Sequence, residues 1–449
     1  MTATALSFPA GLIVAAPSSA SGKTVFTLGL LRHLSRTGVS VASAKAGPDY
    51  IDPAFHARAT GGSCLAMDPW AMTPSRLCAH AQRLGYDEKD VQRTIICEGV
   101  MGLFDGTVTG EGSTADLARM TGWPVVLVMD AGNQGASVAA QLSGFVTHRS
   151  DITVAGVVFN KVSTPRHERI IREAVSAHVP DVKILGAVPR IADLALPGRH
   201  LGLVQATEHP DLDAFMDRAA DLIAEHVDVA ALLALAKKGD GGVAPAVPPA
   251  LPPLGSRIAV ARDEAFAFAY AHVLDGWQGA GAALSFFSPL AGEGPDMESD
   301  AVYLPGGYPE LHGGTLAGNG FLPALRAAAA RGAAVFGECG GYMVLGETLT
   351  DADGGIHKMA GLLPLKTSFQ NRRLHLGYRR GRLVDDGPLG PAGTGFCAHE
   401  FHYATTVSES GAGALFQAVD AEGTDLGSMG LRAGSVMGSF LHLIAREEQ

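Results

Sequence analysis

The sequence predicts two α/β domains, and three observations support this prediction. In both halves of the chain, short β-branched runs alternate with helical stretches, the pattern of parallel sheets that helices cover on two faces. The stretch 236–256 contains five prolines between Pro245 and Pro253. Proline fixes φ and lacks an amide donor, so we expect a semi-rigid linker there, between domains at 1–235 and 257–449. The 449 residues are also 47% hydrophobic, which is enough for two large cores.

The expected strands are short and end at polar or glycine-rich residues. In the first half they lie at 12–15, 39–45, 94–98, 125–130, 154–160 and 183–188, and in the second half at 258–261, 284–287, 301–304 and 334–337. Open α/β sheets bind ligands along the carboxyl ends of their strands. We therefore expect the functional residues at these strand ends.

Charge and cysteine content exclude several classes of partner. The chain has 34 Lys and Arg against 45 Asp and Glu, a net charge of −11, and no basic block. Such a surface repels polyanions, so we expect neither nucleic acid nor an anionic membrane as partner. No apolar run is long enough to span a bilayer, and the five cysteines form no CxxC pair. We expect a soluble cytoplasmic protein that acts on small molecules, and we expect it to form a homodimer.

A phosphate-binding loop follows the first expected strand. Residues 17–24 read PSSASGKT, which fits the pattern G-x-x-x-x-G-K-[ST] except that Pro17 replaces the first glycine. The loop amides around Ser21 and Gly22 would cradle phosphate oxygens, Lys23 would neutralise charge, and the Thr24 hydroxyl would bind Mg²⁺. An ordinary Ser/Gly-rich turn is the alternative, but the intact Gly-Lys-Thr before a helix favours a nucleotide.

Acidic residues follow the next expected strands. Lys45, Asp49 and Asp52 lie in KAGPDYIDP, and Glu98 and Asp105 lie in EGVMGLFDG. Phosphoryl transfer needs carboxylates to hold Mg²⁺ and a cation to spread the developing charge. A single Asp is more often a turn or cap residue, but a sheet edge shared with the phosphate loop favours function. Asn160, at a later strand end, either contacts the edge of adenine or caps its turn.

The second half contains a candidate cysteine nucleophile. Cys339 lies in GECGGYM between an expected strand and a helix, where glycines allow a sharp turn. We expect the helix N-terminus to lower the pKa of the Cys339 thiol. The upstream LPGGYPE segment would supply oxyanion-hole amides, and His442 in GSFLH is the candidate base. The alternative is a buried apolar cysteine, as we expect for the other four.

The segment HEFH at 399–402 does not have the spacing of a zinc protease motif, so we expect no metal there. Four arginines, Arg372, Arg373, Arg379 and Arg380, precede it. They would either face an anionic substrate or form a solvated basic loop.

Seven segments together resemble the cobyrinic or hydrogenobyrinic acid a,c-diamide synthases. They are APSSASGKT, KAGPDYIDP, EGVMGLFDG, LPGGYPE, GECGGYM, HEFHY and GSFLH, and they occur in this order between about residues 10 and 443. The resemblance implies a dethiobiotin-synthetase-like P-loop domain that binds ATP, joined to a class I glutamine amidotransferase domain with a flavodoxin-like fold. It implies that ATP activates the a and c acetates of a corrin ring as acyl phosphates, which ammonia from glutamine then converts to amides in cobalamin biosynthesis.

The resemblance also implies a role for each matching residue. Cys339 would attack glutamine with His442 as its base; Lys23 and Thr24 would serve the phosphates and Mg²⁺, Lys45 the activated carboxylate, and Asn160 adenine. Glu98, with Asp49, would take part in metal binding, while Asp49, Asp52 and Asp105 would act in substrate or phosphate activation. His442 is followed by Leu443 and Ile444 rather than by the His-x-Glu of ordinary class I enzymes, so we expect a backbone carbonyl to orient it. Cobyric acid synthase and nickel-sirohydrochlorin a,c-diamide synthase are the alternatives; a nucleotide switch that has lost its chemistry is a third.

Overall fold

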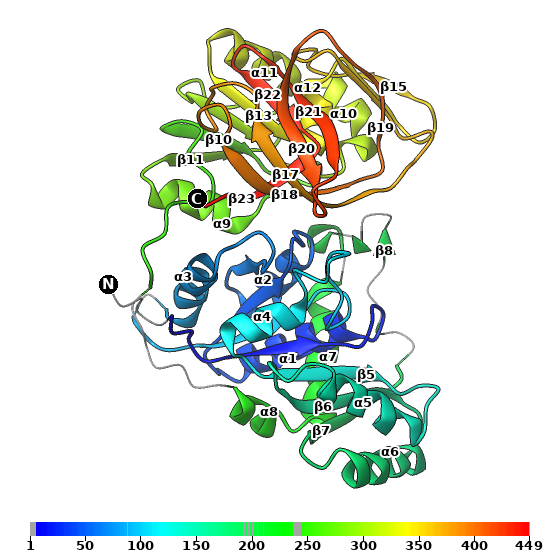
Figure 1. Cartoon of the computed structure of the whole chain (residues 1–449). Coiled ribbons are helices and arrows are strands. Elements are labelled where there is room, and N and C mark those ends of the chain that lie inside the picture. The colour runs from blue at the N-terminus through cyan, green and yellow to red at the C-terminus, as the bar shows by residue number, and fades with distance from the viewer. Residues whose placement is uncertain are drawn as a thin grey trace, which may run out of the picture. The chain divides into compact units, whose positions relative to one another are not determined.

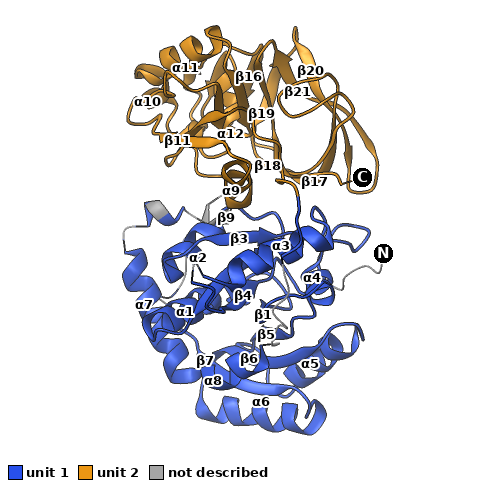
Figure 2. Cartoon of the chain, turned by 90° about the vertical axis from the view of Figure 1, so that its left-hand side faces the viewer, with its two compact units in different colours: residues 1–247 blue, residues 248–449 orange. Residues whose placement is uncertain are grey.

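The computed structural model describes residues 6–448 apart from 88, 192–193, 195–197, 200–201, 204, 210 and 237–243. The chain forms two compact units, residues 1–247 and residues 248–449 (Figure 2). Part of the expected linker, 237–243, lies outside the described residues. Beyond it, Leu251 and Leu254 are buried, and the indole N–H of Trp277 donates to Pro252 O at 3.0 Å. The end of the proline-rich stretch therefore packs on the second unit.

The first unit is built on a seven-stranded parallel sheet with the order β3-β2-β4-β1-β5-β6-β7 (Figure 1). Its strands are β1 (Gly11–Ala15), β2 (Val41–Ala46), β3 (Cys64–Met67), β4 (Thr94–Glu98), β5 (Val125–Asp130), β6 (Val154–Val162) and β7 (Lys183–Pro189), and a separate hairpin pairs β8 (Gly198–Arg199) with β9 (Gly202–Leu203). All five residues of β1 are buried, as in a strand covered on both faces. The strand order reverses around β1, which places the ligand crevice at its carboxyl end.

Helices connect these strands and cover the sheet. They are α1 (Lys23–Arg36), α2 (Asp52–Thr60), α3 (Pro74–Gly85), α4 (Thr114–Thr121), α5 (Ser137–Thr147), α6 (Pro165–His178), the 3₁₀ helix η1 (Ala206–Glu208), α7 (Leu212–His226) and α8 (Val229–Leu235). Helix α1 packs against α2 and α7. It buries Phe26, Leu30 and Leu34 along one stripe, at the spacing of an amphipathic helix.

The second unit combines a parallel core with antiparallel strands. Its ten-stranded sheet has the order β11-β10-β12-β13-β22-β21-β20-β17-β18-β23, and a four-stranded sheet has the order β15-β14-β16-β19. The strands are β10 (Arg257–Ala261), β11 (Ala283–Phe287), β12 (Ala301–Leu304), β13 (Ala334–Glu338), β14 (Thr348–Thr350), β15 (Ile356–Lys358), β16 (Leu365–Ser368), β17 (His375–Leu383), β18 (Gly395–His402), β19 (Thr405–Glu409), β20 (Gly413–Asp420), β21 (Asp425–Ala433), β22 (Val436–Ser439) and β23 (Leu441–Arg446). The helices are α9 (Ala271–Gly279), η2 (Pro309–Leu311), α10 (Gly313–Gly318), α11 (Phe321–Ala330) and α12 (Gly340–Leu345).

The prediction of two α/β units is confirmed, and the ten expected strands are present with ends shifted by at most two residues. The structure adds β3, the β8–β9 hairpin and every strand after residue 345, which the sequence did not predict. All five cysteines are free and buried. Among the described residues, no helix has both the length and the apolar character needed to cross a membrane.

Candidate active sites

The loop after β1 has the form of a phosphate-binding loop, and Pro17 does not prevent it. Ser21 Oγ donates to Ser18 O at 2.9 Å, and Lys23 Nζ donates to Met101 O at 2.8 Å. Burial, together with the nearby charge of Lys45, lowers the pKa of Lys23 to about 8. The Lys23 ammonium is thus held next to the phosphate-binding loop, where phosphate oxygens would replace the Met101 carbonyl as its partner.

Gly22 and Asn160 fit together closely. Gly22 has φ +91°, and a β-carbon built on it would lie 2.1 Å from Asn160 Nδ2, so only glycine fits here. Asn160 Nδ2 donates to Ser21 O at 3.0 Å, and its Oδ1 accepts from Lys161 N at 2.9 Å. The Asn160 side chain therefore holds the phosphate loop against the end of β6, and its contact with adenine stays a prediction.

Thr24 and Glu98 provide a pair of oxygens next to this loop. Thr24 Oγ1 donates to Glu98 Oε1 at 2.7 Å, and Glu98 is fully buried at the end of β4. A hydroxyl and a carboxylate in contact at a phosphate loop are the oxygen ligands that Mg²⁺ prefers, so these residues fit the ion. Asp49 does not share their contact: its Oδ1 accepts from the backbone N–H groups of Ile51 and Asp52 at the start of α2.

Lys45 lies at the centre of the acidic cluster. Its Nζ is 2.5 Å from Asp52 Oδ2, 3.0 Å from Glu98 Oε1 and 3.8 Å from Asp49 Oδ2. Burial alone would lower the pKa of Lys45, but these carboxylates hold it well above its ordinary value. Burial and the charge of Asp49 in turn raise the pKa of Asp52. The structure therefore brings together the residues that the sequence placed at the ends of two strands.

His56 belongs to this cluster and was missed in the sequence. Its Nε2 lies 2.8 Å from Glu98 Oε2, and its Nδ1 lies 3.6 Å from Cys64 Sγ; all three side chains are buried. Burial would lower the pKa of His56, but its contacts with Cys64 and Glu98 raise it to about 10. His56 lies four residues after Asp52 on α2, and this helical spacing was the signal that could have identified it.

Asp105 is separate from the cluster in the described contacts. Its Oδ2 accepts from Gly102 N at 2.8 Å and closes a turn. This turn packs on the phosphate loop, because Leu103 N donates to Ala16 O at 2.8 Å. Asp105 is exposed, and its role in substrate or phosphate activation stays a prediction.

In the second unit, Cys339 occupies a sharp turn between β13 and α12. Its φ of +47° is rare for a residue with a side chain and marks a strained elbow. The Cys339 Sγ lies 3.9 Å from Phe401 O on β18. The prediction of a lowered thiol pKa is wrong for this structure, because burial and the charge of Glu310 raise the pKa of Cys339 well above its ordinary value. The six-residue helix α12 does not offset the loss of solvent, so the thiol needs a base.

His442 lies on β23, three residues after Ser439, whose carbonyl accepts a hydrogen bond from Cys339 N at 2.8 Å. It pairs with His399 of β18, the strand whose Phe401 carbonyl faces Cys339. The imidazole is fully buried, and burial together with His399 and His402 lowers its pKa to about 3, so it is neutral. A neutral imidazole can accept a proton from a thiol. The glycine loop of LPGGYPE packs against His442 and against Gly340, the residue that follows Cys339. A β-carbon on Gly306 would lie 2.3 Å from His442 Cε1, and one on Gly340 would lie 2.9 Å from Gly307 N.

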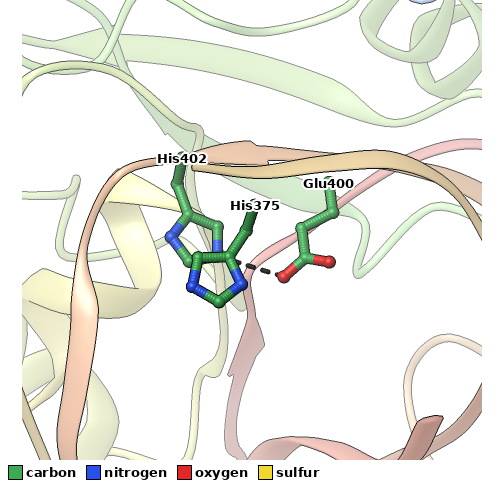
Figure 3. A group of neighbouring side chains, drawn as sticks. All are labelled: His375, Glu400 and His402. Atoms are coloured by element: carbon green, nitrogen blue, oxygen red, sulfur yellow. Dashed lines mark hydrogen bonds and ion pairs between the residues drawn. The ribbon is translucent and has the colours of Figure 1, made fainter. Parts of the chain in front are cut away.

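His375, Glu400 and His402 form a network of neighbouring side chains on β17 and β18 (Figure 3). Their possible ligand atoms lie within 4.8 Å of one another, but Arg379 Nη2 already pairs with Glu400 Oε2 at 2.8 Å. The two imidazole rings are stacked at 4.6 Å with only 5° between their planes. Nitrogen lone pairs lie in the ring planes, so parallel stacked rings do not direct them at one ion. We assign no metal to this network.

The comparisons with known proteins agree with this division into two sites. The profile of the CobQ/CobB/MinD/ParA nucleotide binding domain matches residues 12–204, and that of the CobB/CobQ-like glutamine amidotransferase domain matches 257–449. A hydrogenobyrinate a,c-diamide synthase of Brucella anthropi is 52% identical over 436 residues, covering 97% of this chain and 98% of the relative. Proteins of the same name from Rhizobium meliloti and Rhodobacter capsulatus are 53% and 49% identical, each over 97% of this chain and 99% of the relative.

Proposed function

The chain belongs to the hydrogenobyrinate a,c-diamide synthase family, and from this premise we propose that it amidates the a and c acetates of hydrogenobyrinic acid with ATP and glutamine as co-substrates. One observation carries the proposal: the same chain has a phosphate loop with an acidic cluster and a cysteine elbow with a histidine. The first arrangement suits the activation of a carboxylate, and the second suits the release of ammonia from an amide.

In the first unit, a substrate carboxylate attacks the γ-phosphorus of ATP, which forms an acyl phosphate and releases ADP. Lys23 and the loop amides hold the phosphates, and Lys45 neutralises the reacting carboxylate. Asp49 and Asp52 keep the Lys45 ammonium at the site through the contacts described above. Ammonia then attacks the acyl carbon, and the bond to phosphate breaks to leave the amide.

We assign a Mg²⁺ ion to Thr24 and Glu98, which supply a hydroxyl and a carboxylate oxygen in contact with each other. Such an ion screens the negative charge of the triphosphate when it is bound. The described contacts of Asp49 favour Lys45 and the α2 backbone as its partners, so we give Asp49 a role near the substrate.

In the second unit, the Cys339 sulfur attacks the side-chain amide of glutamine while His442 takes the thiol proton. The tetrahedral intermediate collapses as His442 returns this proton to the departing nitrogen, which leaves as ammonia. Water then hydrolyses the glutamyl thioester to glutamate. The N–H groups of Gly307 and Gly340 are candidates for the oxyanion hole, since the two residues are close enough that a β-carbon on Gly340 would lie 2.9 Å from Gly307 N.

Mass spectrometry of the products tests the substrate. The enzyme is incubated with ATP, Mg²⁺ and glutamine, and with hydrogenobyrinic or cobyrinic acid in parallel. Two amidations of the metal-free ring are expected, as the names of the relatives suggest. Two amidations of both rings would mean that the ring centre is not sensed. Amidation of neither would contradict the proposal and favour another tetrapyrrole, such as nickel-sirohydrochlorin; further amidations would favour cobyric acid synthase.

We also propose a cellular location and an oligomeric state for the protein. A cytoplasmic location agrees with five free, buried thiols in a reducing compartment. A homodimer rests on the sequence expectation alone, and light scattering of the purified enzyme measures it directly.

A further inference from the structure

Glu338 is a buried carboxylate that the chemistry above does not use. It is the last residue of β13, directly before Cys339, and only 1% of it is exposed. Each carboxylate oxygen accepts one described hydrogen bond. Tyr303 Oη donates to Oε2 at 2.6 Å, and the backbone N–H of Leu443 donates to Oε1 at 3.0 Å.

The second of these bonds reaches the strand of the candidate base. Leu443 directly follows His442 on β23, and Glu338 directly precedes Cys339. The hydrogen bond from Leu443 N to Glu338 therefore connects the chain next to the candidate base with the chain next to the candidate nucleophile. In the sheet order, β23 is the last strand and is separated from β13 by β22, β21, β20, β17 and β18. The ladder of β13 ends at Ser439 of β22, three residues before His442, and β23 itself pairs with β18, so the Leu443 bond is a direct contact from β13 to β23 that no ladder of the described strands supplies.

We propose that Glu338 is a positioning residue that fixes the backbone at His442 relative to the Cys339 elbow. The proposal rests on the proposed glutamine hydrolysis. In this role Glu338 replaces, through the main chain, the acid that would follow the histidine in a His-x-Glu triad. The Glu338 oxygens bind a tyrosine hydroxyl and a backbone amide, and only the bond to the Leu443 amide reaches β23, so the geometry of that bond is what matters.

Two substitutions separate geometry from charge. Glu338→Asp keeps the charge, but its shorter side chain draws the carboxylate away from Leu443 N. Glu338→Gln loses the charge but keeps the length: its oxygen can accept from Leu443 N, and its NH₂ group can donate to Tyr303 Oη. We expect Glu338→Asp to lower kcat for glutamine hydrolysis about 100-fold with little change in KM, since a small misplacement of a catalytic group has this effect. We expect kcat for glutamine hydrolysis in Glu338→Gln to stay close to that of the wild type.

Tyr303→Phe is the matched control, because it removes the other hydrogen bond of the same carboxylate and leaves the Leu443 bond in place. We expect near-normal glutamine hydrolysis from it. Ammonia-dependent amidation should be unchanged in all three variants, because the first unit is untouched, and the thermal unfolding midpoint of each variant shows that the second unit has folded. The rate of Cys339 alkylation by iodoacetamide, followed by mass spectrometry, gives a readout without turnover, and only Glu338→Asp should slow it.

Normal kcat and alkylation in Glu338→Asp would overturn the proposal. Loss of activity in Glu338→Gln equal to that in Glu338→Asp would also overturn it, since a side chain of the right length that can still accept from Leu443 N would then not be sufficient. A wild-type enzyme that releases no glutamate from glutamine would contradict the proposed function instead, so the two failures are distinguishable.

Discussion

The imidazole of His442 packs directly on the backbone of Gly306, at a distance that leaves no room for a side chain. A β-carbon built on Gly306 would lie 2.3 Å from Cε1 and 3.2 Å from Nε2 of His442. Position 306 in LPGGYPE must therefore be glycine to leave room for the imidazole of His442, in addition to any role of its neighbours as amide donors. The loop after β12 therefore sets where the imidazole can lie.

Gly306→Ala should displace the imidazole from Cys339 and lower kcat for glutamine hydrolysis about 100-fold. Ammonia-dependent amidation should not change, because the first unit is untouched. Gly318→Ala in α10 is the matched control, since nothing lies within 4 Å of its added methyl group. Steady-state glutamate release measures both variants. Equal activity of the two would show that His442 tolerates the shift.

Cys339→Ser should abolish glutamine-dependent amidation and spare ammonia-dependent amidation, because the hydroxyl is a much weaker nucleophile than the thiol. Cys78→Ser, which replaces another buried free thiol in the first unit, is the control and should retain both activities. Product formation from glutamine or from ammonium salt measures the difference. Loss of both activities in Cys339→Ser alone would mean that the two sites do not act separately.

Much of the nucleotide-binding unit could be predicted from the sequence because its strands are continuous apolar runs. The strands at 94–98 and 125–130 match the structure to the residue. The cluster of Lys45, Asp52 and Glu98 followed from a simple rule, since carboxyl ends of parallel strands share one edge. His56 was missed because it lies on helix α2, one turn beyond that edge, and a rule about strand ends does not extend to the helix that follows.

The second unit was predicted only as far as α12. The later strands contain many charged and glycine residues, as in β17, whose exposed face interrupts the apolar pattern. Their pairing depends on contacts between distant parts of the chain, such as β13 with β22, which local propensity does not encode. The raised pKa of Cys339 was also unpredictable, because it depends on burial by β18 and by the glycine loop.

His56→Ala should weaken Mg²⁺ binding by about 10- to 100-fold, because it removes the imidazole that holds Glu98 Oε2, the oxygen that does not contact Thr24, and so orients the carboxylate. The apparent affinity is measured from the dependence of ATP-driven amidation on Mg²⁺ concentration. His80→Ala, which removes another histidine from the same unit, should leave this dependence unchanged. An unchanged Mg²⁺ requirement in His56→Ala would remove Glu98 from the metal site or show that it is oriented without His56.

Asp49→Asn should stop amidation and leave glutamine hydrolysis measurable. The amide cannot balance the charge of Lys45, although it can still accept the backbone bonds that begin α2. The helix should therefore persist, and the thermal unfolding midpoint should change little. Asp87→Asn in a surface turn is the control. Amidation at the wild-type rate would remove Asp49 from the mechanism.

The buried carboxyl of Glu338 should make the stability of the enzyme depend on pH. Burial raises the pKa of Glu338 from 4.5 to about 7, although Tyr303 and Leu443 partly oppose the shift. Between these two pH values the folded state holds a proton that the unfolded state has released. The protonated carboxyl therefore contributes to the free energy of unfolding fully below pH 4.5, and this contribution is lost as the pH rises towards 7. Its full size is about 3 kcal/mol. Thermal unfolding of the wild type and of Glu338→Gln is compared from pH 5 to 8. The midpoint of the wild type should fall relative to that of the variant as the pH rises, because Gln cannot titrate; parallel curves would mean that Glu338 is already ionised at pH 5.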